Sequence, residues 1–240
     1  MKAKATQDAS KLIPIDEQVQ NALAWLKERS NQASLDALNR FGIPTTNAYG
    51  VAREDIKLLA KLIGRNHPLA IAIWETGVYE TQMLVSMIGD PALLSPEQMD
   101  IWCNGIDNWA VCDSLCFNFF DRSPHAWGKV DLWSSWPGEF QKRTAFALLW
   151  SLANHDRHDN HEAFLHGLTL IEREATDERH FVKKAVNMAL RSVGKRDALL
   201  NDAAVKVARR LAESQDPTAR WIGKDALREI SSTKVLECLR

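Results

Sequence analysis

Apolar residues recur along most of this 240-residue chain at the spacing of an α-helix, and this periodicity limits the possible folds more than any other feature. In the segment 182–193, six apolar residues follow the i, i+3, i+4, i+7, i+8, i+11 pattern of one buried helix face. They are Val182, Ala185, Val186, Ala189, Leu190 and Val193. No segment alternates apolar and polar residues convincingly over the length of a strand. The sequence therefore predicts an all-α protein.

A weak internal repeat of about 40 residues indicates how the helices are organised. The segments 140–145, 181–186 and 221–226 each begin with an aromatic residue, followed two or three positions later by a basic residue. Their starts lie 41 and 40 residues apart, within the range of HEAT or armadillo helix pairs, which stack and form a long concave surface. We therefore predict a single HEAT-like repeat domain over residues 1–240, an α-α superhelix with a concave basic groove and a loose tail at residues 1–15. A compact irregular helical domain is the alternative.

The composition excludes several classes of protein. Hydrophobic residues make up 45 % and charged residues 25 % of the chain, as is typical of globular domains. No apolar run approaches the ~18–20 residues of a membrane span, and the N-terminus has no apolar signal-peptide core. Three of the four cysteines cluster at positions 103–116, which favours a reducing compartment over a disulfide framework. We predict a cytoplasmic protein that does not bind membranes.

The formal net charge of −1 conceals two halves of opposite charge. Residues 1–139 carry 12 basic and 17 acidic side chains, whereas residues 140–240 carry 18 basic and 14 acidic ones. Within residues 179–228 there are 12 basic and 5 acidic side chains. A basic half of this kind is typical of proteins that bind a polyanion, and a solvated helix surface is the alternative.

The segment Asp107–Asp113 contains the first candidate site. Trp109 and Asp113 are four residues apart, so their side chains are neighbours on a helix. Asp113 also falls on the apolar stripe of Cys112 and Cys116, where a carboxylate is unexpected. One interpretation is a core tryptophan with Asp113 at the edge of the stripe, where it caps a helix or pairs with an arginine. The other interpretation is a carboxylate held against an aromatic face in a groove.

Basic residues form the second candidate site. On the polar side of the helix predicted over 182–193, spacings of 4, 3 and 4 residues align Lys184, Met188, Arg191 and Lys195 in one stripe. Such a stripe suits contacts with phosphate oxygens, and an ordinary solvated face is the alternative. One basic residue at the start of each repeat segment can line the same surface near helix N-termini, whose N–H groups attract anions. These residues are Arg143, Lys183 and Lys224.

Other kinds of chemistry have less support. His155, His158 and His161 lie at three-residue intervals and can hold a metal, but so polar a segment favours an exposed loop. Cys112 and Cys116 are better explained as core residues, because no CxxC pair completes a zinc site. The sequence has no P-loop, GxGxxG, HExxH or GxSxG motif. We therefore predict no metal, no nucleotide and no other cofactor.

Three motifs, in order along the chain, resemble a known family. The sequence reads Asn-Trp-x-x-x-Asp at 108–113, Lys-Arg-x-Ala at 142–145 and Phe-Val-Lys-Lys-Ala-x-x-x-Ala-Leu-Arg at 181–191. This order resembles the DNA alkylation repair glycosylases of the AlkD type, built from HEAT-like repeats, over about residues 42–230. The resemblance implies that an aromatic residue and an aspartate in a basic, concave cleft act on DNA carrying a cationic N3- or N7-alkylated purine.

The resemblance also implies roles for individual residues. By position, Trp109 and Asp113 match the aromatic residue and the acid of the family, and Arg143 matches the arginine in the cleft. The chain departs from the pattern where the best-known members carry a tryptophan, because Met188 takes that place. Methionine offers polarizable apolar contact but no aromatic face. The family also includes branches thought to bind DNA without excising bases.

We therefore predict a monomeric DNA glycosylase that hydrolyses the N-glycosidic bond of cationic N3- or N7-alkylated purines in double-stranded DNA, associated with the nucleoid when it is bound. The predicted catalytic residues are Asp113 and Trp109. The predicted DNA-binding residues are Arg143, Lys183, Lys184, Met188, Arg191 and Lys224. Two alternatives stay open: a non-catalytic module that binds branched or bent DNA, and a protein-binding scaffold.

Overall fold

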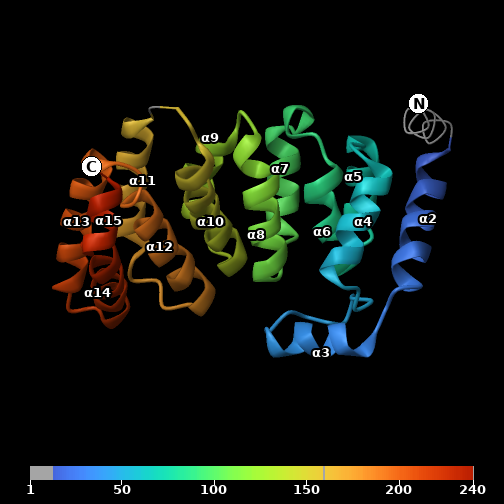
Figure 1. Ribbon diagram of the computed structural model, residues 1–240, viewed down its shortest axis with the longest axis horizontal. Helices are drawn as coiled ribbons and strands as arrows, with labels where there is room; N and C mark the ends of the chain where they lie inside the picture. The colour runs from blue at the N-terminus through green and yellow to red at the C-terminus, as the bar shows by residue number, and fades with distance from the viewer. Residues whose placement is uncertain (1–12, 159, 240) are drawn as a thin grey trace. The chain divides into compact units, whose positions relative to one another are not determined.

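The computed structural model describes residues 13–158 and 160–239, and within these ranges the chain forms helices and no strands (Figure 1). The all-α prediction is therefore confirmed. The α-helices are α2 (Ile15–Lys27), α3 (Gln32–Arg40), α4 (Arg53–Ile63), α5 (His67–Trp74), α6 (Tyr79–Ile88), α7 (Pro96–Asn104), α8 (Trp109–Asn118), α9 (Ala126–Ser134), α10 (Glu139–His155), α11 (His161–Glu174), α12 (His180–Val193), α13 (Ala198–Ala212), α14 (Pro217–Ile230) and α15 (Thr233–Cys238). Two short 3-10 helices are η2 (Pro91–Leu93) and η3 (Phe120–Arg122).

The chain divides into two compact units. Unit 1 comprises residues 13–102 and 107–122 of the described chain, and unit 2 comprises residues 103–106, 123–158 and 160–239. The predicted N-terminal tail lies outside the described residues up to position 12, and α2 begins at Ile15. The single domain inferred from the sequence stays a prediction. None of the described helices is long and apolar enough to cross a membrane.

Unit 1 packs around a cluster of buried aromatic rings. The ring of Trp102 is fully buried, and its centroid lies 5.5 Å from that of Trp74 and 5.6 Å from that of Phe119. Helix α6 contacts α4, α5 and α8, and α2 contacts α4 and α5. Helix α3, in contrast, buries none of its residues. Helix α3 therefore contributes no fully buried side chain to the core of unit 1.

Unit 2 is built from consecutive helix pairs, α9 with α10, α11 with α12, and α13 with α14. The second helices of the pairs, α10, α12 and α14, pack side by side in one layer (Figure 1). Helix α12 buries the six apolar residues that the periodicity predicts. Gly223 brings α14 close to α13, because a Cβ atom at this position would lie 2.2 Å from the backbone nitrogen of Ala212. The repeat segments 140–145 and 181–186 begin at the second residue of α10 and of α12, whereas the segment 221–226 lies in the middle of α14.

Four short polar residues precede a proline, and this pattern predicts a helix start at each of them, Asp90, Ser95, Ser123 and Asp216. The starts of α7 and α14 are confirmed. The carboxylate of Asp216 accepts hydrogen bonds from two backbone N–H groups in the first turn of α14, and the hydroxyl of Ser95 accepts one in α7. Asp90 caps only the 3-10 helix η2. The start predicted at Ser123 is wrong by two residues, because its hydroxyl accepts from the N–H of His125 in a turn and α9 begins at Ala126.

Candidate functional site

Trp109 and Asp113 share one side of α8 at the surface of unit 1. The side chain of Asn108 caps this helix by accepting a hydrogen bond from the Val111 N–H at 3.0 Å. Trp109 and Asp113 are both half-buried, whereas Cys112, between them in the sequence, is fully buried. The structure therefore excludes a fully buried position for the indole and for the carboxylate. It confirms the core position predicted for Cys112.

A residue that sequence analysis missed, Phe41, lies beside this pair. The indole Nε1–H of Trp109 donates a hydrogen bond to the Phe41 carbonyl at 2.9 Å. The two rings meet edge to face with their centroids 6.4 Å apart, and Phe41 is 65 % exposed. Phe41 lies 68 residues before Trp109, at the start of a segment that looks like an ordinary loop. No local spacing in the sequence could therefore have linked the two aromatic residues.

The loop that follows Phe41 is fixed by a buried carboxylate. Oε1 of Glu80 accepts hydrogen bonds from the N–H groups of Gly50 at 2.8 Å and Val51 at 3.1 Å, and Oε2 accepts one from Tyr49 at 3.0 Å. Glu80 is fully buried, so these bonds replace the water that an ionised carboxylate would otherwise need.

Gly50 has a positive φ of 76°, a backbone conformation that glycine adopts without steric cost. Its carbonyl accepts hydrogen bonds from the backbone N–H and the side-chain amide of Asn31, at 2.9 and 3.1 Å. Because Asn31 also caps α3, this loop is tied to the helix that Phe41 follows. Burial and the charge of Glu80 raise the pKa of the neighbouring Tyr79 hydroxyl to about 12, although Arg53 opposes this shift, so Tyr79 stays a neutral phenol.

In unit 2, basic residues of the first two repeat segments pack on the aromatic residue of the segment that follows. The guanidinium of Arg143 lies 5.8 Å from the ring centroid of Phe181 and donates a hydrogen bond to the Phe181 carbonyl at 3.3 Å. The Nζ atoms of Lys183 and Lys184 lie 4.5 and 5.1 Å from the ring of Trp221. These cation–π contacts connect α10 to α12 and α12 to α14.

The basic residues of the three repeat segments differ in how exposed they are to a ligand. Arg143 is only 6 % exposed, so most of its guanidinium is used inside unit 2. Lys183 is half-buried, whereas Lys184 and Lys224 are exposed. Their roles in DNA binding stay predictions, and the two exposed lysines have the access that phosphate contacts need.

Side chains of the basic stripe also form contacts within the protein. A nitrogen of the Arg191 guanidinium lies 3.4 Å from the sulfur of Met188. Arg191 forms an ion pair with Glu229 on α14, and Lys195 reaches the same carboxylate at 2.8 Å. Lys184, Met188 and Arg191 therefore lie on α12, and Lys195 lies two residues beyond its end. Acidic residues of α14, which the sequence-based site does not include, lie beside Arg191 and Lys195.

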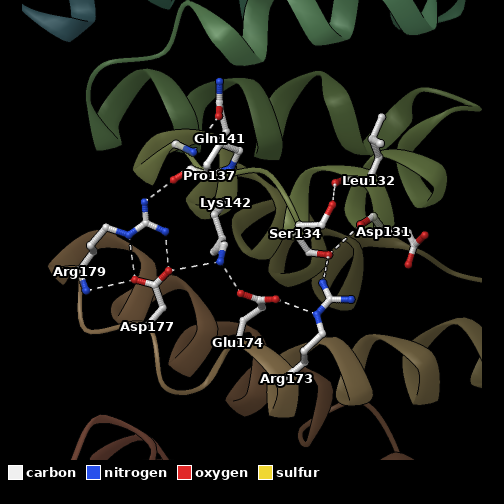
Figure 2. A network of polar contacts seen from close by, with 12 residues as sticks. Asp131, Leu132, Ser134, Pro137, Gln141, Lys142, Arg173, Glu174, Asp177 and Arg179 are labelled. Atoms are coloured by element: carbon white, nitrogen blue, oxygen red, sulfur yellow. Dashed lines mark hydrogen bonds and ion pairs between the residues drawn. The ribbon is translucent and has the colours of Figure 1, made fainter.

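An ion-pair network fixes the N-terminal ends of α10 and α12 (Figure 2). Lys142 on α10 forms ion pairs with Glu174 and, at 3.4 Å, with Asp177. The guanidinium Nε of Arg179, the N-cap residue of α12, lies 2.9 Å from Asp177, and Arg173 reaches Glu174 at 2.7 Å (Figure 2). Burial raises the pKa of Asp177, but the hydrogen bonds and charge of Arg179, with the charge of Lys142, outweigh it and lower the pKa. These charges position the helix ends and are not free for a ligand.

The histidine segment does not assemble a metal site in the part of the chain that the structure describes. His158 pairs with Asp156 at 2.8 Å and His161 with Asp197 at 3.1 Å. Among the described residues there is no group of three or more His, Cys, Asp or Glu side chains that could hold a metal ion.

The model of a protein family described as "DNA alkylation repair enzyme" matches residues 22–230. The chain belongs to the DNA alkylation repair enzyme family. This confirms the resemblance found in the three sequence motifs. A search of curated protein sequences gives no match.

A solved structure supports the same fold. It is described as "A new family of proteins related to the HEAT-like repeat DNA glycosylases with affinity for branched DNA structures". It superposes with a TM-score of 0.71 at 21 % identity, covering 87 % of this chain and 94 % of that one. The HEAT-like repeat fold predicted from the sequence is thereby confirmed, whereas the concave basic groove stays a prediction.

Proposed function

We propose that this member of the DNA alkylation repair family is a DNA glycosylase for cationic N3- or N7-alkylated purines. The observation that carries the proposal is the Trp109–Asp113 pair, which lies half-buried on one side of α8 beside the exposed ring of Phe41. A carboxylate next to aromatic rings at a protein surface suits a cationic sugar intermediate. Family membership supports DNA as the substrate.

The chemistry of this substrate requires little more than such a pair. An alkylated, positively charged purine leaves as a neutral base, so the enzyme need not protonate the leaving group. The charge that has to be stabilised develops on the deoxyribose, as in glycoside hydrolysis. The carboxylate of Asp113 stabilises this charge electrostatically and orients the attacking water. The indole of Trp109 adds a cation–π attraction of about 0.5–2 kcal/mol.

A hydrogen bond that orients the Trp109 indole supports this proposed role. Its Nε1–H is bonded to the Phe41 carbonyl, and the loop after Phe41 is held through Glu80. The indole therefore does not have to be ordered when DNA binds, which favours a preorganised site. Phe41 adds a second ring that a docked nucleotide can contact.

DNA contacts in this proposal come from the basic residues of unit 2. Lys184 is exposed near the start of α12 and Lys224 is exposed in the middle of α14, whereas Lys183 is half-buried. Such residues contact phosphates and contribute affinity without reading sequence. Arg143 holds Phe181 and thereby supports the helix end that carries the two lysines of α12.

The test is excision of 7-methylguanine from duplex DNA by the purified protein. We expect the wild-type protein to release the base, and Asp113→Asn to lose turnover while it keeps most of its DNA affinity, because the side chain faces the sugar charge rather than a phosphate. Asp107→Asn is a matched control, since it removes an exposed carboxylate that lies before the same helix. No release by the wild type, or equal release by wild type and Asp113→Asn, would contradict the mechanism.

A second candidate function is the binding of branched or bent DNA without excision. Met188 favours it, because this side chain offers no aromatic face where the best-known glycosylases of the family carry a tryptophan. The affinity for branched DNA that is described for the structural neighbour also favours it. Tighter binding to a four-way junction than to a duplex of the same length, with no base released, would select this function over the first.

A further inference from the structure

Two carboxylates on α14 lie against the basic stripe of α12. Oε1 of Glu229 lies 2.8 Å from the Nζ of Lys195, and Oε2 forms an ion pair with the guanidinium of Arg191. A second carboxylate, that of Asp225, lies 3.9 Å from Nη1 of Arg191. One glutamate therefore bridges two cations of the stripe that the sequence assigns to phosphate contacts.

This arrangement resembles the way in which a phosphate group would bind the same cations. Each oxygen of the Glu229 carboxylate takes one cation, as two non-bridging oxygens of a phosphate would. The cluster is not sealed in the core, because the side chains of Arg191, Lys195 and Glu229 are 27 %, 39 % and 29 % exposed. A nucleic-acid backbone can therefore reach the cations only in competition with this carboxylate.

Glu229 is ionised when the protein meets DNA at neutral pH. Partial burial raises the pKa of its carboxyl group, but the hydrogen bond from Lys195 and the charges of Lys195 and Arg191 outweigh burial. The pKa is consequently lowered from the ordinary value, and the negative charge persists across the neutral range.

We propose that Glu229 limits the affinity of the DNA-binding surface for undamaged backbone by occupying Arg191 and Lys195, so that a DNA phosphate has to displace it. The proposal rests on the proposed function only in assuming that the stripe on α12 faces DNA. In the free protein, Arg191 and Lys195 carry a fixed internal partner instead of mobile solvent ions. While Glu229 stays beside them, these two cations neutralise fewer DNA phosphates, so fewer of the counterions condensed on the DNA are released and contacts with undamaged backbone gain less affinity.

The experiment measures Kd for one undamaged duplex as a function of salt concentration, with the full-length protein and with Glu229→Gln. We expect Glu229→Gln to bind several-fold more tightly at ~0.1 M salt. Each cation released to a phosphate makes the slope of log affinity against log salt steeper by about 0.9. The two cations together should therefore steepen it by about one to two.

A matched control separates this effect from a simple change in net charge. Glu172 on α11 forms a two-point ion pair with Arg210 on α13, with both distances at 2.7 Å, in the helix layer away from the stripe. Glu172→Gln removes the same charge and should leave Kd and the salt slope close to the wild-type values. In an Arg191→Gln, Lys195→Gln background, Glu229→Gln should no longer tighten binding.

Each outcome decides one question. If Glu229→Gln is folded by circular dichroism and thermal melting but binds no more tightly than the wild type, the role of Glu229 is refuted. Equal tightening by Glu172→Gln refutes it as well. If Glu229→Gln does not fold, Asp225→Asn is tested in an Arg228→Gln background, because Asp225 also pairs with Arg228. It should show a smaller shift in the same direction, and the absence of that shift refutes the proposal. A wild-type protein that binds no DNA even at low salt contradicts the proposed function instead.

Discussion

We predict that the buried carboxylate of Glu80 stabilises the loop that follows Phe41, beside the candidate site. Glu80→Ala leaves three backbone N–H groups without their acceptor, and those of Gly50 and Val51 belong to buried residues. Each buried donor left unsatisfied costs about 1–3 kcal/mol, and water entering the space of the lost side chain recovers part of this. We expect the free energy of unfolding to fall by about 3–5 kcal/mol, a loss at the upper end for a single substitution.

Glu80→Gln separates the loss of one hydrogen-bond acceptor from the loss of the whole side chain. It keeps an oxygen acceptor for Gly50 and Val51 but turns an amide NH₂ group toward the N–H of Tyr49, where Oε2 accepts at 3.0 Å. We expect a loss of about 1–2 kcal/mol for this variant. Glu75→Ala, at an exposed glutamate after α5, should change stability by no more than about 0.5 kcal/mol.

Denaturant unfolding gives the free energies, and amide hydrogen exchange at residues 49–51 reports on the loop directly. Exchange at these three amides should accelerate strongly in Glu80→Ala and less in Glu80→Gln. A loss below about 1 kcal/mol in Glu80→Ala, with the three amides still protected, would refute the argument that this carboxylate fixes the loop.

Three further predictions concern the aromatic site, the helix packing and the ion-pair network. Phe41→Ala should reduce base excision more than DNA affinity, because it removes the ring beside Trp109 and leaves the phosphate contacts; equal losses in both assays would contradict this. Gly223→Ala should lower the melting temperature clearly, since the added Cβ meets the backbone of α13 at 2.2 Å, whereas Gly128→Ala, with no atom within 4 Å of its Cβ, should be neutral or slightly stabilising. The pKa of Asp177 is lowered, so its contribution is present above its ordinary value of 3.8 and is lost as pH falls through the folded-state value. Asp177→Asn should therefore destabilise the protein at pH 7 and differ less from the wild type below pH 3.8, as measured by melting curves at each pH.

The candidate site was only partly predictable. The i, i+4 spacing of Trp109 and Asp113 correctly predicted that the two share a helix side, because both belong to α8. Phe41 was missed because it reaches Trp109 through a hydrogen bond across 68 residues. Glu229 was missed for the same reason, since it lies 34 residues after Lys195 and looks like an ordinary surface glutamate in the sequence.

Many of the helices could be predicted from the sequence itself, because their signals act over a few residues, although the start predicted at Ser123 came two residues too early. The apolar period of 182–193 fixed the buried face of α12, and the carboxylate of Asp216 capped α14 two and three residues away. Only the tertiary structure decided which charges stay available for DNA. Glu80 accepts hydrogen bonds from backbone N–H groups, whereas Glu229 pairs with Lys195, because folding brings different groups next to each carboxylate. No local sequence pattern encodes this difference.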